Sequence, residues 1–401
     1  MRKLLLTIVL CVLSLSISAQ MKELANAKAN LKSGKNLEQS ENELRKLLLK
    51  SDNRNNDKIW LTLFDIIKKQ YDQGNEKLYL KQNYDTAKIF LLTGKLFEVL
   101  EQYDSLDALP NKKGEVKPRY RKKHADLLND YRPNLYNGGR FFVNKGQYKE
   151  GYKMFDMFID CIHEPLFTSY DYENQAELLH EAAYWASYCA FKQKNFEAIR
   201  HHMTLALRDS VHYCSMLQIL TETYKSENDT TRYIETLYEG FTKYPDELFF
   251  FRSLVDHLAQ NADWKEIVKI ANKGLQHDST SIEFLFPKCS ALLNIGNLKE
   301  CIATGNKIIS LNDTLADVYY HVGLAYFTQA TNLEEQIGRR TLKQKKEIKE
   351  YFDKARLYME KYRTMEPDKV LQWSSPLYTI YLNLNMGKEF EEMDRLLKSK
   401  K

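Results

Sequence analysis

A period of about 34 residues runs through the middle of this chain and constrains its fold more than any single motif does. The register is strict from Cys214 to Asp313, where residues one period apart share their character. Four such columns hold Leu217, Phe251 and Leu285; Tyr224, Leu258 and Leu292; Tyr233, Ile267 and Cys301; and Gly240, Gly274 and Ile308. A fixed period of this length is typical of a repeat array, in which each unit buries its apolar face only by stacking on its neighbours.

The residues within each period follow a helical pattern. Apolar residues recur at i, i+3, i+4 and i+7 in most segments, as they do in amphipathic α-helices. With 15 Gly and 8 Pro among 401 residues, the chain has few of the turn residues that an all-β fold uses. The 26 Tyr and 19 Phe supply rings that pack between helices. We therefore predict an all-α fold.

The repeats resemble tetratricopeptide repeats (TPR), helix pairs with small residues at positions 8 and 20 and aromatic residues around them. The best single match is the segment 132–165, with Gly139 at position 8, Gly151 at position 20 and Phe155 at position 24. Further units begin near His180, Cys214, Leu248, Ile282, Ala316 and Asp368. The resemblance implies a right-handed α-solenoid of stacked antiparallel helix pairs.

The organisation of the chain divides into four parts on this basis. Residues 1–19 form a signal peptide, 20–110 a helical region of degenerate TPR-like units, and 111–130 a basic connection with Pro118 and Gly114 as breakers. Residues 131–401 form the TPR solenoid, with an insertion at about 331–350 and a capping helix at the C-terminus.

The first 19 residues have the three parts of a secretory signal. Arg2 and Lys3 form a basic start, residues 4–15 an apolar run, and residues 16–19 contain small residues suited to cleavage. The run is shorter than the about 20 apolar residues that a spanning helix needs, although an uncleaved anchor is the alternative. We expect a periplasmic protein with no transmembrane segment after signal removal, and outer-membrane association is compatible with this location.

The charge of the chain argues against a nucleic-acid partner. Its net charge is +5, and removal of Arg2 and Lys3 with the signal leaves +3 (5 − 2), which is too little for a phosphate-binding surface. Two basic stretches, 112–123 and 339–349, are either contact sites for an acidic partner or solvated faces.

Catalytic and metal-binding motifs are not evident. The sequence contains no GxSxG, HExxH or P-loop motif. His201 and His202 are adjacent, so on a helix we expect them to point to different sides and not to act together as an i, i+4 pair would. We predict no enzyme activity, no cofactor and no metal.

The cysteines offer one candidate disulfide. Cys289 and Cys301 occupy positions 8 and 20 of one unit, which the TPR resemblance places in contact. In an oxidising compartment the pair could form a bond, and two packed thiols are the alternative.

A partner-binding groove is the site that the resemblance implies. In TPR proteins the first helix of each pair lines a concave groove, and we expect about half of the rings below to line it and half to pack in the core. Aromatic and Arg side chains are typical of binding hot spots. The groove residues are Tyr136, Asn137, Arg140, Tyr184, Tyr188, Phe191, Phe249, Arg252, Phe286, Tyr320 and Phe327.

These observations favour a non-catalytic periplasmic scaffold that binds a protein or peptide of the cell envelope. Envelope assembly, secretion and outer-membrane transport are the expected settings. The alternative is a helical solute- or glycan-binding protein for nutrient capture at the outer membrane. An enzyme with appended TPR units would need a non-repeat region of about 100–150 residues, which the chain lacks.

Overall fold

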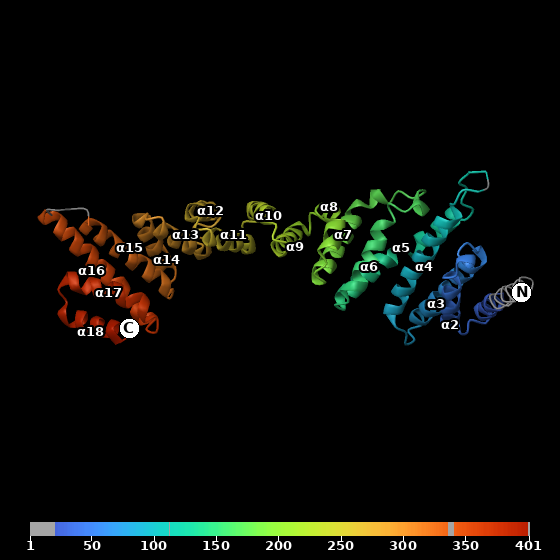
Figure 1. Cartoon of the computed structure of the whole chain (residues 1–401), viewed down its shortest axis with the longest axis horizontal. Coiled ribbons are helices and arrows are strands. Elements are labelled where there is room, and N and C mark those ends of the chain that lie inside the picture. Colours follow the sequence, from blue (N-terminus) through green and yellow to red (C-terminus); the bar gives the residue numbers. More distant parts are fainter. Residues whose placement is uncertain (1–20, 112, 336–340, 400–401) are drawn as a thin grey trace, which may run out of the picture. The chain divides into compact units, whose positions relative to one another are not determined.

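The computed structural model describes residues 21–111, 113–335 and 341–399, and all regular elements in these ranges are helices (Figure 1). The expected signal peptide, residues 1–19, lies outside the described residues. The prediction of an all-α array of antiparallel helix pairs is confirmed. The chain divides into two compact units, Met1–Ile219 (unit 1) and Leu220–Lys401 (unit 2), and each is described by itself.

In unit 1, each helix packs on the one that follows it. Residues 21–33 are helical, and 3₁₀ turns follow at Pro165–Phe167 and Tyr172–Gln175. The longer helices are α2 (Leu37–Leu48), α3 (Asp57–Tyr79), α4 (Thr86–Asp107), α5 (Arg121–Asn144), α6 (Tyr148–Asp160), α7 (Ala176–Lys192) and α8 (Phe196–Ala206). Helix α9 (Tyr213–Ser226) contains the boundary between the units.

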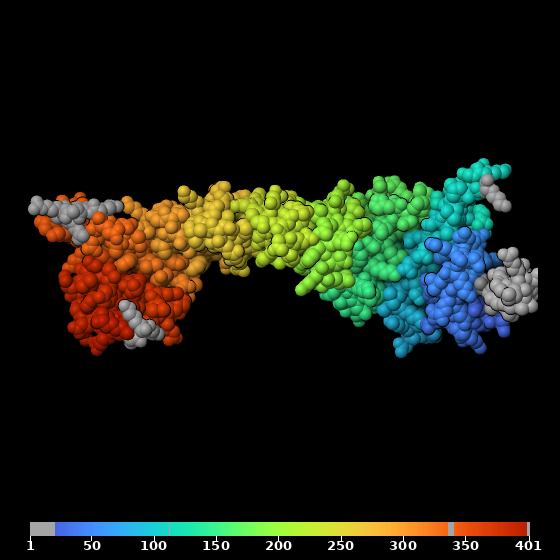
Figure 2. Space-filling view, in the orientation of Figure 1, coloured from blue at the N-terminus to red at the C-terminus, as the bar shows by residue number. Residues whose placement is uncertain are grey.

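In unit 2, the helices reproduce the repeat period of the sequence. They are α10 (Thr230–Lys243), α11 (Leu248–Gln260), α12 (Trp264–His277), α13 (Ile282–Asn294), α14 (Leu298–Leu311), α15 (Ala316–Glu335), α16 (Leu342–Met365), α17 (Val370–Leu384) and α18 (Gly387–Ser399). Helices α11, α13 and α15 begin one period apart, and so do α10, α12 and α14. On the face shown in Figure 2, neighbouring helices within each unit are in direct surface contact. The folded helix pairs thus repeat with the period of the sequence, as the resemblance to tetratricopeptide repeats implies.

Close approach of helices depends on a pair of residues in each repeat. A Cβ built on Gly240 would overlap the ring of Phe250, and one built on Gly274 would lie 2.6 Å from the ring of Phe284. One period later the same columns hold Ile308 and Val318, both fully buried in one apolar cluster. A glycine facing a large ring is therefore replaced by two aliphatic side chains of intermediate size, which keeps the volume of the contact similar.

The turn between the two helices of a pair has a constant backbone conformation. Lys194, Asn228, Ala262 and Gly296 lie one repeat period apart, and all four have φ between 53° and 75°. A left-handed residue ends a helix by turning the chain away from it, and glycine adopts this conformation without a Cβ penalty. Ala262 lacks both the freedom of glycine and the polar side chain of Asn228, so its turn is strained.

Two expected boundaries differ from the structure. The basic connection was expected over 111–130, but α5 begins at Arg121, whose guanidinium lies 2.7 Å from the carboxylate of buried Asp104. The insertion expected at 331–350 lengthens two helices: residues 331–335 end α15, and residues 342–350 begin α16. These extra turns add Leu333 and Ile348 to the apolar cluster of the two helices and so need no separate core.

The candidate disulfide pair lies inside unit 2. The Sγ atoms of Cys289 and Cys301 are 3.7 Å apart and both thiols are free. The contact with Cys301, together with burial, raises the pKa of the Cys289 thiol. Because an S–S bond is about 2.05 Å long, the pair is a packed thiol contact here, and its oxidation stays a prediction.

The first testable consequence concerns the Gly240–Phe250 contact. We expect Gly240→Ala to destabilise the protein by about 1–3 kcal/mol, because the added methyl group overlaps a buried ring. Gly387→Ala is the matched control, since the added carbon would meet no atom within 4 Å beyond its chain neighbours and its own helix backbone. Urea denaturation measures both. Equal stability of the two variants would contradict this account of the contact.

The second consequence concerns the strained turn. We expect Ala262→Gly to stabilise the protein by about 0.5–1 kcal/mol, because it relieves left-handed strain that exceeds the added entropy of glycine in the unfolded chain. The reciprocal variant Gly296→Ala should lose about 1 kcal/mol. If the denaturation midpoints of both variants shifted in the same direction, the assignment of left-handed strain to the Ala262 turn would be contradicted.

Candidate functional site

The predicted groove residues of unit 1 lie on α5 and α7, which contact each other. Asn137 is exposed, while Tyr136 and Arg140 on the same helix are half-buried. The guanidinium of Arg140 lies 2.7 Å from the carboxylate of Glu181 on α7 and 4.7 Å from the ring centroid of Trp185. The indole N–H of Trp185 donates to the same carboxylate at 3.2 Å. Glu181 therefore holds a cation and a large ring in fixed positions at the edge of both helices.

Tyr136 connects this edge to the core. Its ring packs against Phe155 and Phe158 of α6, at centroid distances of 5.8 and 5.7 Å. Burial, followed by the carboxylate of Glu181, raises the pKa of Tyr136 to about 12. The hydroxyl therefore stays protonated at neutral pH, with the carboxylate of Glu181 beside it as hydrogen-bond acceptor.

An aromatic cluster covers the adjoining part of α7. Tyr184 stacks on His212 with a centroid distance of 4.1 Å, and Trp185 and Tyr188 surround this pair. Tyr184 is buried, so it belongs to the core and not to the accessible surface, although the sequence placed it in the groove. Tyr188 and Phe191 are half-buried. The amino group of Lys192 lies 5.2 Å from the Tyr188 ring.

A hollow opens beside this cluster, and we call it the α7 hollow. Its volume is about 900 Å³. It is lined by the start of α7 and by the segment that follows α8, with Asn174, Gln175, Ala176, Glu177, Leu178, His180, Glu181, Arg208, Asp209, Ser210, Val211 and His212. A smaller hollow of about 330 Å³ shares Gln175 and Leu178 with it and reaches Tyr136 and Asn137 of α5. Two predicted groove residues, Tyr136 and Asn137, thus line a hollow that shares residues with the α7 hollow.

The wall formed by residues 208–212 is fixed by one carboxylate. Asp209 accepts backbone N–H groups of Val211 and His212 at 2.9 and 3.3 Å, and its second oxygen lies 2.7 Å from Nδ1 of His212. This arrangement leaves the Val211 side chain 81% exposed. Leu178 on the opposite wall is 36% exposed. Sequence reasoning missed both apolar residues, because they lie at repeat edges outside the helix positions that the TPR pattern assigns to a groove.

The predicted groove residues of unit 2 have different surroundings. Arg252 is exposed and forms an ion pair with Glu283 at 2.9 Å. The rings of Phe249, Phe286, Tyr320 and Phe327 are half-buried against other rings, those of Phe250, His321, Tyr362 and Phe352 respectively. Tyr320 and Phe327 pack on the apolar cluster around α16. In unit 2 these aromatic residues contribute more to packing between helices than to an open surface.

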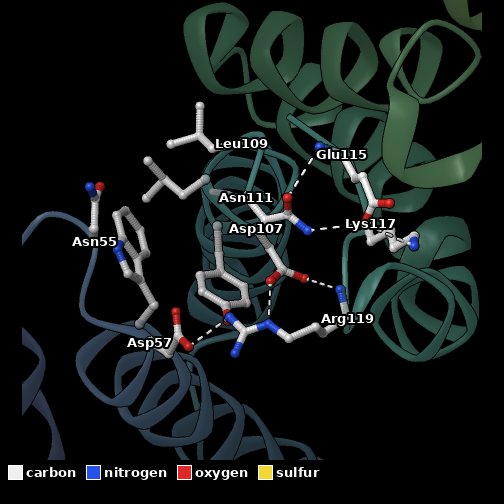
Figure 3. A pocket seen from close by; sticks show the side chains of 11 residues that line it. Asn55, Asp57, Asp107, Leu109, Asn111, Glu115, Lys117 and Arg119 are labelled. Atoms are coloured by element: carbon white, nitrogen blue, oxygen red, sulfur yellow. Dashed lines mark hydrogen bonds and ion pairs between the residues drawn. The ribbon is translucent and has the colours of Figure 1, made fainter. Parts of the chain in front are cut away.

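A second polar hollow, of about 410 Å³, lies at the basic connection (Figure 3). Figure 3 shows Arg119 between two carboxylates, with 2.7 Å to Asp57 at the start of α3 and 2.9 Å to Asp107 at the end of α4. Lys117 pairs with Glu115 at 3.0 Å. These cations are neutralised within the chain, which favours a structural role for this part of the basic stretch over recognition of an acidic partner.

Next to this hollow, His124 is enclosed by aromatic rings. Tyr120 stacks on it at 5.6 Å, and the rings of Tyr103 and Phe64 lie at 5.8 and 6.3 Å. Its Nδ1 atom is buried without a hydrogen-bond partner. Burial, aided by the charge of Lys123, lowers the pKa of His124. The imidazole is therefore held neutral in the fold.

Within the described residues, one group of side chains has the arrangement of metal ligands. It comprises Asp156, His201 and His202, on α6 and α8 and away from the lining of the α7 hollow. Its ligand atoms lie within 4.8 Å of one another, although the adjacent histidines were expected to point to different sides of the helix.

Comparison with known proteins gives structural similarities only. No protein-family model and no curated protein matches the chain. The C-terminal part of a TPR repeat-containing protein from Cytophaga hutchinsonii is 8% identical, covering 65% of this chain and 95% of that one, with a TM-score of 0.41. A TPR repeats protein from Bacteroides fragilis is 12% identical, covering 66% and 98%, with a TM-score of 0.29. YrrB, a TPR protein with an unusual peptide-binding site, is 12% identical, covering 63% and 95%, with a TM-score of 0.25. At these values the similarities assign no ligand, and the repeat type of this chain rests on its own helix spacing.

The third consequence concerns the pH dependence of stability. An unfolded imidazole takes up a proton below about pH 6.5, whereas the neutral His124 of the fold resists it, so acidification favours the unfolded state. We expect His124→Phe to gain stability relative to the wild type as the pH falls from 8 to 5. Urea denaturation at both pH values measures the difference. If the stability difference between His124→Phe and the wild type did not depend on pH, a neutral His124 in the fold would be contradicted.

Proposed function

We propose that this protein is a non-catalytic scaffold that binds an extended segment of another protein in the α7 hollow. The observation that carries the proposal is the exposure of Leu178 on α7 and Val211 after α8 in a hollow whose other lining residues, apart from Ala176, are polar. Binding sites commonly combine a few apolar anchors with polar groups that fix orientation. The adjacent Arg140–Trp185 pair adds a held cation and a large ring at the same edge.

The polar lining suits a peptide main chain. An extended peptide presents N–H and C=O groups that need partners when they leave water. Gln175 lines both hollows, and Asn137 in the smaller hollow is an exposed amide, so both side chains can donate and accept. Leu178 and Val211 would then contact side chains of the bound segment, with a preference for aliphatic or aromatic residues.

The cellular setting that we propose is the periplasm, with the bound protein taking part in envelope assembly, secretion or outer-membrane transport. The basic, apolar and small-residue order of residues 1–19 supports export. No helix among the described residues is both long and apolar enough to cross a membrane.

The fourth prediction tests the hollow. Random peptides displayed on phage are selected on the full chain, and the selected peptides are synthesised and titrated by calorimetry. We expect Val211→Glu to weaken peptide binding by tenfold or more, because a carboxylate replaces an apolar anchor. Leu371→Glu is the matched control, because Leu371 is 71% exposed and lies on α17 in unit 2. Neither change should affect folding, since both side chains are exposed.

Two outcomes would overturn the proposal. One is that no peptide is selected, and the other is that selected peptides bind Val211→Glu as tightly as the wild type. Binding of oligosaccharides by the wild-type chain, with no peptide selected, would favour the alternative of nutrient capture.

A further inference from the structure

Four side chains that commonly bind metal ions converge between α6 and α8. Asp156 and Asp160 lie one turn apart on α6, and His201 and His202 are adjacent on α8. One ligand atom each from Asp156, His201 and His202 lie within 4.8 Å of one another. Nε2 of His201 is 4.0 Å from a carboxylate oxygen of Asp160, which places the fourth residue beside the other three.

The geometry explains how adjacent helical residues come together. The His201 and His202 rings have centroids 4.5 Å apart and are inclined at 66°, so both imidazoles reach the same edge of α8. Nε2 of His202 lies 2.7 Å from Oδ1 of Asp156. Adjacent residues leave a helix in different directions, but α6 places a carboxylate opposite each of these two imidazoles.

Burial divides the group into a fixed side and an open side. The side chain of His202 is 3% exposed and that of Asp156 is 29% exposed, whereas His201 is 59% exposed. The ring of Tyr152 packs on His202 at 6.0 Å and limits its rotation. The fixed pair can orient an ion, and the exposed imidazole can close over it from solvent, which provides an entry path.

The surroundings of the group are acidic. Burial and the neighbouring carboxylate of Asp156 raise the pKa of Asp160. The carboxylates of Asp156 and Asp160, which face the two imidazoles from α6, favour a bound cation.

We propose that Asp156, His201 and His202 bind one divalent transition-metal ion of the Zn²⁺ class, with Asp160 or water completing the coordination. Imidazole nitrogen and carboxylate oxygen are the ligands that such ions accept, at about 2.0–2.2 Å. Tetrahedral ligand atoms at that distance are about 3.4 Å apart. The 2.7 Å contact of His202 with Asp156 therefore opens slightly on binding, and the exposed His201 side chain moves inward.

Bound metal would join the second helices of two consecutive pairs, α5–α6 and α7–α8. The site uses different helices from the α5 and α7 residues that border the α7 hollow, so it is independent of the proposed peptide binding. Its expected effect is stabilisation of unit 1, because an ion that binds only the folded chain shifts the folding equilibrium.

The test uses the full chain after removal of metal with EDTA, titrated with ZnCl₂ by calorimetry. We expect one Zn²⁺ per chain and a rise of the thermal transition on addition of Zn²⁺. His201→Ala and Asp156→Asn should each weaken binding by at least about tenfold, as loss of a ligand requires. His201 is exposed, so its replacement leaves the fold intact and any loss of binding reports on the ligand.

His277→Ala is the matched control, because His277 is an exposed histidine at the end of α12 in unit 2. Its affinity for Zn²⁺ should equal that of the wild type. Three outcomes would overturn the proposal: no binding of Zn²⁺, equal affinity in His201→Ala and the wild type, or equal loss in His277→Ala and His201→Ala.

Discussion

The close approach of neighbouring helices is the constraint on which the rest of this structure depends. A helix pair with one apolar stripe cannot bury that stripe alone, so its stability comes from contact with the next pair. At Gly240 and Gly274 the backbone approaches a Phe ring so closely that a Cβ does not fit. The recurrence of this contact after one repeat period sets the spacing of these helices in unit 2, and with it the positions of the side chains that they expose.

The fold could be predicted because the signal is local and repeated. Helix starts at Leu248, Ile282 and Ala316 follow from hydrophobic spacing alone. The full lengths of α15 and α16 could not be predicted in this way. Their additional turns have no counterpart in the other repeats, so in the sequence they were interpreted as an insertion. The start of α5 was misplaced because Lys122 and Lys123 were interpreted as part of a basic loop, whereas they occupy the exposed face of a helical turn.

The candidate sites were predicted less completely, for a physical reason. The family pattern identifies positions on a helix, and Arg140, which it assigned to the groove, forms an ion pair with Glu181 of α7. It cannot tell whether a ring such as Tyr184 faces solvent or stacks on a residue from a connecting segment, as Tyr184 does on His212. The Asp156–His202 contact joins residues 46 positions apart, and only the packing of α6 against α8 reveals it. The carboxylates spaced i, i+4 on α6 were the one signal in the sequence that could have indicated it.

The left-handed turn residues also make the repeats of unit 2 unequal. In an array where each pair contacts only its neighbours, local opening begins where the intrinsic stability of a pair is lowest. Gly296 gives the α13–α14 pair a relaxed turn, while Ala262 leaves strain in the α11–α12 pair. Amide hydrogen exchange in α11 and α12 should therefore report opening events that do not involve unfolding of the whole chain. Two neighbouring repeats with nearly the same sequence pattern would thus differ in how often they open locally. The left-handed backbone angle of Ala262 would determine which helix pair of the two opens first.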